Sequence, residues 1–281
     1  MITHPFGNTN RNIAAVGQGT WDIDTAQRDQ AIATLRRGLD LGMSHIDTAE
    51  MYGSGAAEIL LGEAIKGRRD EVFLVSKVLP NNASRAGTRA ACERSLRQLR
   101  TDCLDCYLLH WRGSYPLEET FAAFEDLQRD GKIRSFGVSN FDVDDLDEAF
   151  QLLGPGKLAC NQVLYHLQER AIEHSVIPWC ERHGLAVVAY SPLGHDNFPS
   201  PDTASGRVLG KVARAHGATP HQIALAFLTL RPSIFAIPKA SSVTHVEDNA
   251  ASADINLSGA EVRLIDEAFP RGPKPSSLPM I

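Results

Sequence analysis

Apolar residues along the chain follow two alternating patterns. Short apolar runs without polar alternation are followed by segments in which apolar residues recur every three or four positions. The first pattern is typical of strands buried on both faces of a parallel sheet, and the second of helices that cover such a sheet. We therefore expect eight strands, each followed by a helix, at residues 13–20, the run beginning at His45, and 72–76, 104–109, 133–138, 158–161, 185–189 and 234–237.

Eight such units without a low-complexity linker predict an α/β protein, a closed (β/α)8 TIM barrel formed as a single domain over residues 1–281. An open doubly wound sheet is the alternative. That fold usually carries a Gly-x-Gly-x-x-Gly turn after its first strand. Here Gly17 and Gly19 lack the third glycine, because position 22 is Asp22. The barrel is therefore the preferred architecture.

Several helix boundaries are marked by local signals. Asp24 or Thr25 is expected to cap the first helix, and Asp142 a later one. Thr219-Pro220 is a good N-cap and first-turn pair, and Ser258-Gly259-Ala260-Glu261 is a capping box. The segment 270–281 is rich in Pro and Ser and is expected to be irregular.

Composition narrows the class of protein further. A formal net charge of −6, with no long Lys/Arg run, argues against a nucleic-acid partner. The apolar runs are too short to span a bilayer, and no secretory leader is recognised. Five cysteines are a sparse, odd count that fits a reducing compartment, so we expect a cytoplasmic protein. Cys103 and Cys106 have metal-like spacing but no second pair, so we interpret them as structural and expect no metal.

Ionisable side chains stand where the expected strands end. Asp47 and His110 close two apolar runs, Lys77 closes a third, and Tyr52 follows Asp47 by five residues. In a barrel the carboxyl ends of the strands surround one mouth, so these side chains are expected to converge there. A buried lysine needs a carboxylate partner, and an ammonium beside a phenol favours its ionised form. The set is therefore a candidate general acid with its partners, with a purely structural ion pair as the alternative.

The order of several short blocks resembles the aldo-keto reductase superfamily over essentially the whole chain, especially its bacterial methylglyoxal-reductase-like members. The resemblance rests on eight blocks in the family's order: Gly17–Trp21, Asp47–Gly53, Val75–Lys77, Leu108–Trp111, Gly137–Phe141, Asn161-Gln162, Tyr190–Leu193 and Ile237–Lys239. It implies a barrel with an N-terminal β-hairpin, for which residues 5–13 are available. It also implies NADPH bound across the barrel mouth, in preference to NADH, and reduction of a small carbonyl substrate to an alcohol.

By position, the resemblance implies that Tyr52 is the general acid, that Lys77, held by Asp47, lowers its pKa, and that His110 orients the carbonyl. Trp21 and Trp111 would join Tyr52 and His110 as substrate-binding residues. The implied cofactor contacts are Gly19, Thr20, Trp21, Asp47, Ser139, Asn140, Gln162, Tyr190, Ser191, Leu193, Lys239, Ser241, His245, Asp248 and Asn249. Ser139, Asn140 and Gln162 would bind the nicotinamide carboxamide, Tyr190 would stack on its ring, and Lys239 would meet the 2′-phosphate.

The chain departs from the family's pattern after Lys239, where Ala240 and His245 replace a common Ser and Arg. A neutral histidine supplies little charge, which weakens the expected 2′-phosphate clamp. The segment after Phe269 is too short for the long specificity loop of larger relatives. It predicts an open pocket for small aldehydes and ketoaldehydes such as methylglyoxal.

Two other functions compete with the reductase. A Schiff-base aldolase would use Lys77 as its nucleophile but would need that lysine to be neutral. A redox-sensing subunit would bind the cofactor and turn over little. We expect a monomer.

Overall fold

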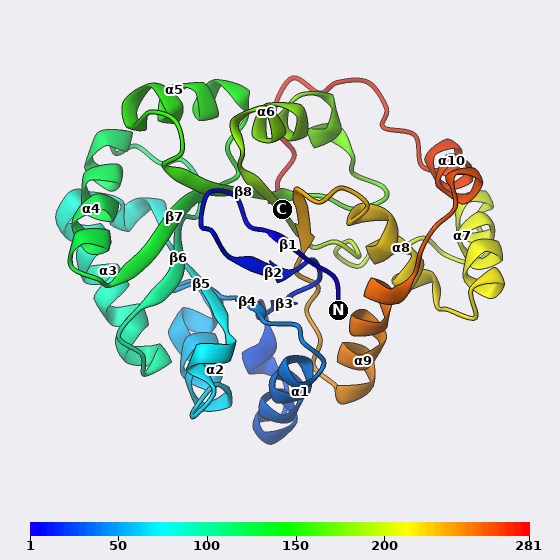
Figure 1. The fold of residues 1–281 in the computed structure, drawn as a ribbon, viewed down its shortest axis with the longest axis horizontal. Helices are drawn as coiled ribbons and strands as arrows, with labels where there is room; N and C mark the ends of the chain where they lie inside the picture. Colours follow the sequence, from blue (N-terminus) through cyan, green and yellow to red (C-terminus); the bar gives the residue numbers. More distant parts are fainter.

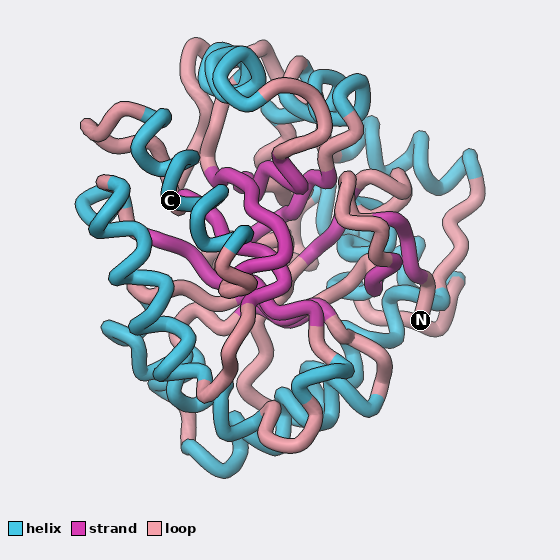
Figure 2. Tube along the Cα trace, turned by 60° about the vertical axis from the view of Figure 1, so that its left-hand side comes forward, coloured by secondary structure: helices cyan, strands magenta, loops and turns pink.

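The computed structural model describes residues 1–281 and has a parallel eight-stranded sheet at its centre, ringed by helices (Figures 1 and 2). The strand order is β10-β9-β8-β7-β6-β5-β4-β3. The strands are β3 (Gln18–Gly19), β4 (His45–Asp47), β5 (Phe73–Val78), β6 (Leu104–Leu109), β7 (Ile133–Ser139), β8 (Leu158–Leu164), β9 (Ala186–Tyr190) and β10 (Ile234–Ala236).

The two ends of this sheet meet and close the barrel. Val16 pairs with Ala236 and Gly19 with Lys239 in parallel bridges, and the Gly19 amide donates to the Pro238 carbonyl at 3.1 Å. Nearly every strand residue is buried, as expected for strands with side chains both inside the barrel and beneath the helices. The prediction of a (β/α)8 barrel is confirmed, and the open doubly wound alternative is wrong.

The helices follow the strands along the chain and cover the outside of the barrel (Figure 1). They are α1 (Arg28–Asp40), α2 (Ala56–Ala64), α3 (Arg85–Leu99), α4 (Leu117–Arg129), α5 (Val143–Leu153), α6 (Val176–His183), α7 (Ala204–Ala215), α8 (Pro220–Leu228), α9 (Val243–Ala251) and α10 (Gly259–Ala268).

Three of the predicted helix caps are confirmed. The Asp142 side chain accepts from the Asp145 amide, and Thr219 and Ser258 each form a capping box. The cap expected at Asp24 or Thr25 is wrong. Those residues lie in a short 3-10 helix (Ile23–Thr25), and the chain extends again before Gln27 caps α1 by accepting from the Gln30 amide.

The N-terminal hairpin pairs β1 (Thr3–Pro5) with β2 (Asn12–Ala14), which confirms the expected hairpin with slightly wider bounds. Its turn directs Phe6 into the barrel, where the ring lies 4.8 Å from that of Phe73 and 5.0 Å from that of Phe235. Phe6 is fully buried. The hairpin therefore fills this end of the barrel.

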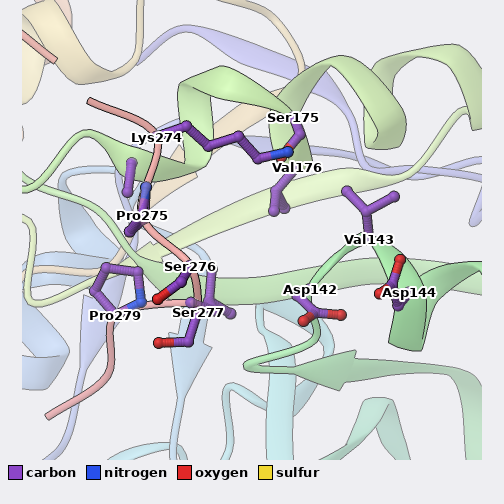
Figure 3. A pocket seen from close by; sticks show the side chains of 12 residues that line it. Asp142, Val143, Asp144, Ser175, Val176, Lys274, Pro275, Ser276, Ser277 and Pro279 are labelled. Atoms are coloured by element: carbon purple, nitrogen blue, oxygen red, sulfur yellow. The ribbon is translucent and has the colours of Figure 1, made fainter. Parts of the chain in front are cut away.

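Residues 270–281, here called the tail, form no regular element, as predicted. The tail passes the start of α5 and of α6, and encloses with them a cavity of about 150 Å³ (Figure 3). The Gly272 carbonyl lies 3.1 Å from His174 Nε2, which holds the beginning of the tail. Its last residues, Met280 and Ile281, reach the mouth of the barrel.

Candidate active site

Asp47 and Lys77 form an ion pair at the mouth end of the barrel. Lys77 Nζ lies 2.5 Å from Asp47 Oδ1 and 2.9 Å from the Thr48 carbonyl, and both side chains are buried. The sequence predicted that Lys77 follows its strand, whereas Lys77 lies inside β5, paired with Leu108 of β6. The alternation of side chains along β5 turns this lysine into the barrel and its neighbour Ser76 toward the helices, where it bonds Glu58 of α2.

Tyr52 brings its phenol to the same point. It begins a short 3-10 segment (Tyr52–Gly55) between β4 and α2, and Lys77 Nζ donates to its hydroxyl oxygen at 3.0 Å. Because the lysine supplies the proton of this hydrogen bond, the phenol's own proton is free for another acceptor. The expected meeting of Asp47, Tyr52 and Lys77 is therefore present in the structure.

The electrostatic state of Tyr52 differs from the prediction. Burial raises the pKa of Tyr52, Lys77 lowers it, and the pKa ends above the ordinary value of 10.0. Burial lowers the pKa of Lys77, but Asp47 and Tyr52 outweigh that effect and raise it. The lysine is thus an ammonium and Tyr52 a neutral phenol. Lys77 lowers the pKa of Tyr52 as expected, but burial raises it by more, so the net direction is opposite to the one predicted.

Asp47 is the anionic partner in this site. Burial raises the pKa of Asp47 above its ordinary value, and Lys77 and Gln162 offset part of that rise. We take it as a carboxylate because both of its oxygens accept hydrogen bonds, one from Lys77 and the other from Gln162 Nε2 at 2.7 Å. A charged Lys77 cannot serve as the neutral nucleophile that a Schiff-base aldolase requires.

His110 follows β6 and stands beside Tyr52, with ring centroids 5.9 Å apart. Burial, followed by the charge of Lys77, lowers the pKa of His110 to about 2, so the imidazole is neutral. Its Nδ1 atom is buried without a hydrogen-bond partner. A neutral ring next to the phenol can donate one hydrogen bond to a carbonyl oxygen without changing its charge near neutral pH.

A second set of polar residues lies beside this group. Asn140 Nδ2 donates to the His110 carbonyl at 3.1 Å, and the Tyr190 hydroxyl donates to Asn140 Oδ1 at 2.9 Å. Ser139 is buried beneath Asn140 and donates to the Gln162 carbonyl at 2.8 Å. The strand ends of β7, β8 and β9 thus present a connected polar wall, in which Ser139 supports the other members.

A cavity of about 440 Å³ opens at the mouth. The predicted site residues that line it are Gly19, Thr20, Trp21, Asp47, Tyr52, His110, Trp111, Asn140, Gln162, Tyr190, Ser191, Leu193 and Lys239. Lys239 is the only lysine or arginine among the lining residues. Most of the predicted set is therefore brought together in one place.

Five predicted cofactor residues do not line this cavity: Ser139, Ser241, His245, Asp248 and Asn249. Ser139 is the last residue of β7, and the other four lie on α9 or just before it. His245 is exposed, and Asp248 accepts from the Thr219 hydroxyl at 3.1 and 3.2 Å. Asp248 thus ties α9 to the start of α8 in this structure.

The structure adds lining residues that the sequence analysis missed. His195, in the loop after β9, stacks on Trp21 with ring centroids 5.1 Å apart and planes 7° apart. Met51, Met280 and Ile281 also line the cavity. Met51 directly precedes Tyr52, and this adjacency was an available signal, whereas a Pro/Ser-rich tail carries no periodicity that shows where it docks. The tail therefore forms part of the cavity wall at this side, and the expectation of an open pocket stays a prediction.

No group of three or more His, Cys, Asp or Glu side chains is arranged to hold a metal. All five cysteines are free, and Cys106 is buried in the apolar barrel interior. No helix combines the length and apolar character needed to cross a bilayer.

These features define a barrel with a lysine-paired tyrosine at its mouth, and the chain belongs to the aldo/keto reductase family, whose model matches residues 15–269. It is 46% identical over 272 residues to methylglyoxal reductase YeaE of Escherichia coli (strain K12), covering 96% of each chain. It is 32% identical over 255 residues to a glyoxal reductase of Bacillus subtilis (strain 168), covering 89% of this chain and 87% of that one. An aldo-keto reductase from Klebsiella pneumoniae solved in complex with NADPH is 44% identical, with a TM-score of 0.94 and full coverage of both chains.

Proposed function

We propose that this protein is an NADPH-dependent carbonyl reductase that reduces small aldehydes and ketoaldehydes, methylglyoxal among them. The observation that carries the proposal is the buried chain of contacts from Asp47 to Lys77 to the Tyr52 hydroxyl. The similarity to a methylglyoxal reductase and a glyoxal reductase supports the substrate class.

The residues of the mouth fit the cofactor. Asn140 and Gln162 line the same cavity as Tyr52 and offer amide groups that would hydrogen-bond the carboxamide of the nicotinamide. Tyr190 offers an aromatic ring on which the nicotinamide ring would stack. Lys239 offers a cation in the same cavity, as a phosphate would need. The NADPH in the Klebsiella pneumoniae relative supports this assignment. When bound, NADPH would supply the hydride.

Residues of the chain would supply the proton and stabilise the charge that remains after its transfer. Tyr52, a neutral phenol with its oxygen occupied by Lys77, would donate its proton to the carbonyl oxygen. The Lys77 ammonium, held by Asp47, would stabilise the phenolate that remains. His110 would donate a hydrogen bond to the same oxygen and orient the carbonyl. Trp21 and Trp111 would form the walls on either side.

The lining also bears on which carbonyl compounds enter. Trp21, Met51, Trp111, Met280 and Ile281 contribute apolar surface, and two lining acids, Asp22 and Asp196, add negative charge. Apart from Lys239, which we assign to the cofactor, no lysine or arginine lines the cavity to bind a carboxylate. We therefore expect neutral aldehydes to be reduced in preference to carboxylate-bearing ones.

The free cysteines agree with a cytoplasmic location, and we expect the enzyme to act as a monomer. A subunit that binds NADPH without turnover is the competing function. It would reveal itself in the assay below as tight cofactor binding with no aldehyde-dependent oxidation.

The test follows NADPH consumption optically with a panel of neutral and carboxylate-bearing aldehydes. Tyr52→Phe should lower kcat by ~10²–10⁴-fold, the usual contribution of a general acid, while NADPH binding is kept. Tyr115→Phe is the matched control, because Tyr115 is exposed and outside the cavity. A Tyr52→Phe enzyme as active as the parent would refute this mechanism, and a borohydride-trapped adduct on Lys77 would favour the aldolase.

A further inference from the structure

Tyr52 begins the short 3-10 segment Tyr52–Gly55, whose backbone departs from regular helical dihedral angles. The three residues after it all have positive φ angles: Gly53 at 54°, Ser54 at 52° and Gly55 at 93°. This left-handed region is unfavourable for Ser54, because its Cβ crowds the following carbonyl oxygen. Such a conformation persists only where surrounding contacts over-determine it. The position of the Tyr52 hydroxyl therefore depends on what anchors the segment on either side of it.

Two glutamates provide these anchors. Glu50 precedes Tyr52, and its Oε1 accepts from the Leu79 amide at 2.7 Å and from Asn82 Nδ2 at 3.0 Å. Its other oxygen accepts from Arg94 at 3.0 Å. Glu58 follows Tyr52 on α2, and its Oε1 accepts from the Ser76 hydroxyl at 2.6 Å. Each glutamate thus ties the Tyr52 segment to β5 or to the residues just after it.

The partners of these glutamates flank Lys77. Ser76 immediately precedes the lysine, and Leu79 lies just beyond the end of β5. Backbone hydrogen bonds add to the connection, since the Thr48 amide donates to the Val75 carbonyl at 2.9 Å. The segment that carries the phenol is therefore anchored on both sides to the segment that carries the ammonium. This arrangement sets the distance between the two groups.

The burial of Glu58 argues against a role in stability alone. The residue is fully buried, and its Oε2 atom has no hydrogen-bond partner. An unsatisfied buried polar atom destabilises the folded state, because it loses its hydrogen bonds to water without gaining others. Packing between α2 and β5 could be achieved with apolar side chains at positions 58 and 76 at lower cost, because replacing both partners of a buried hydrogen bond by apolar groups of the same shape can be nearly neutral. What an apolar side chain would not supply is the directional bond to Ser76.

We propose that Glu50 and Glu58 are positioning residues that hold the Tyr52 hydroxyl at hydrogen-bond distance from Lys77. This inference rests on the proposed function, in which Tyr52 is the general acid. Neither glutamate lines the cavity, so neither is expected to touch substrate or cofactor. Both act through the backbone that carries Tyr52.

The experiment compares variants that remove the acceptor with variants that keep it. Glu58→Met removes the acceptor for Ser76 at similar volume, and Glu58→Gln retains an oxygen there. Glu63→Met is the matched control, since Glu63 lies on the same helix but binds Arg28 and Arg100 instead of β5. We expect Glu58→Met to lower kcat about 10–100-fold, the effect of a misplacement near 1 Å, with the Kd for NADPH unchanged. Glu58→Gln and Glu63→Met should stay within about threefold of the parent.

A second readout reports the geometry without turnover. Ultraviolet difference titration of each variant against the same variant carrying Tyr52→Phe gives the titration midpoint of Tyr52. Separation from Lys77 should move this midpoint upward in Glu58→Met and leave it in place in Glu63→Met. If Glu58→Met does not fold, Glu50→Ala replaces it, with Glu50→Gln as its conservative partner.

The outcomes separate this inference from the proposed function. A parent protein that reduces no aldehyde would refute the reductase, and the titration alone would then decide the positioning role. A folded, NADPH-binding Glu58→Met or Glu50→Ala enzyme with parental kcat and an unchanged Tyr52 midpoint would overturn the inference. Loss of thermal stability without either change would show that the glutamates are merely structural.

Discussion

The ionisation of Tyr52 is decided by a competition between desolvation and one ammonium. Lys77 Nζ lies 3.0 Å from the phenol oxygen of Tyr52. Its charge lowers the pKa of Tyr52, but burial raises that pKa by more. A neutral phenol is the form that donates a proton, so the geometry suits carbonyl reduction at neutral pH. The reverse reaction needs the phenolate and should be slower until the pH is high.

This balance predicts the pH dependence of kcat in the reduction direction. Because the pKa of Tyr52 lies above 10.0, activity should be level from about pH 6 to 9 and be lost only as the pH rises through that pKa. His110 should add no inflection near its ordinary value of 6.5, because its pKa is lowered to about 2. Steady-state rates measured across this range check both statements. A midpoint between about pH 7 and 9 that disappears in Tyr52→Phe would contradict the first.

Some properties of the site residues could be predicted from the sequence and others could not. The types and order of Asp47, Tyr52, Lys77 and His110 were sufficient to nominate them, since the carboxyl ends of barrel strands share one mouth. The sign of the Tyr52 pKa shift was not predictable, because it depends on how completely the folded chain excludes water. The bond from Gln162 to Asp47 joins β8 to β4, and no local pattern signals it.

At the level of single strands, the register between neighbouring strands decides which side chains lie side by side at the mouth of the barrel. Lys239 follows β10 and is set beside Gly19 by the bridge that closes the barrel. The expected neighbours of Lys239 on α9 do not line the cavity in this structure. Lys239 is therefore the residue that we propose meets the 2′-phosphate of NADPH.

We therefore predict that cofactor preference depends on Lys239. Lys239→Met should weaken NADPH binding about 10–100-fold, since a charge-assisted hydrogen bond is worth about 1.5–3 kcal/mol, and should leave NADH binding nearly unchanged. His245→Ala is the comparison, with a smaller expected effect because His245 is exposed away from the cavity. Fluorescence titration of both cofactors measures the ratio. Equal losses of NADPH and NADH affinity in Lys239→Met would refute a phosphate-specific role.

At the scale of the whole molecule, the two ends of the chain serve opposite ends of the barrel. The hairpin places Phe6 inside the barrel. The tail passes the starts of α5 and α6 (Figure 3), and its last residues, Met280 and Ile281, line the cavity at the mouth. The tail thus adds apolar surface to a pocket whose other apolar walls come from Trp21 and Trp111.

This placement predicts a role for the tail in substrate choice. Met280→Ala should raise KM for aldehydes with large apolar substituents by about fivefold, corresponding to about 1 kcal/mol of lost apolar contact, and should change methylglyoxal reduction little. Ser276→Ala, in the same tail but lining the separate cavity of about 150 Å³, is the control. Steady-state kinetics with a series of aldehydes of increasing size checks this. A uniform change in KM across the series would argue against a contact with the substituent.

Local patterns along the chain were enough to predict the alternation of strands and helices, three of the four expected helix caps and the residues at the strand ends, because each depends on neighbouring residues. The stacking of His195 on Trp21, the anchoring of the Tyr52 segment by Glu50 and Glu58, and the docking of the tail could be seen only in the folded chain. The same holds for the upward pKa shift of Tyr52. These features depend on water exclusion and on contacts between residues far apart in the chain, for which periodicity and capping signals carry no information.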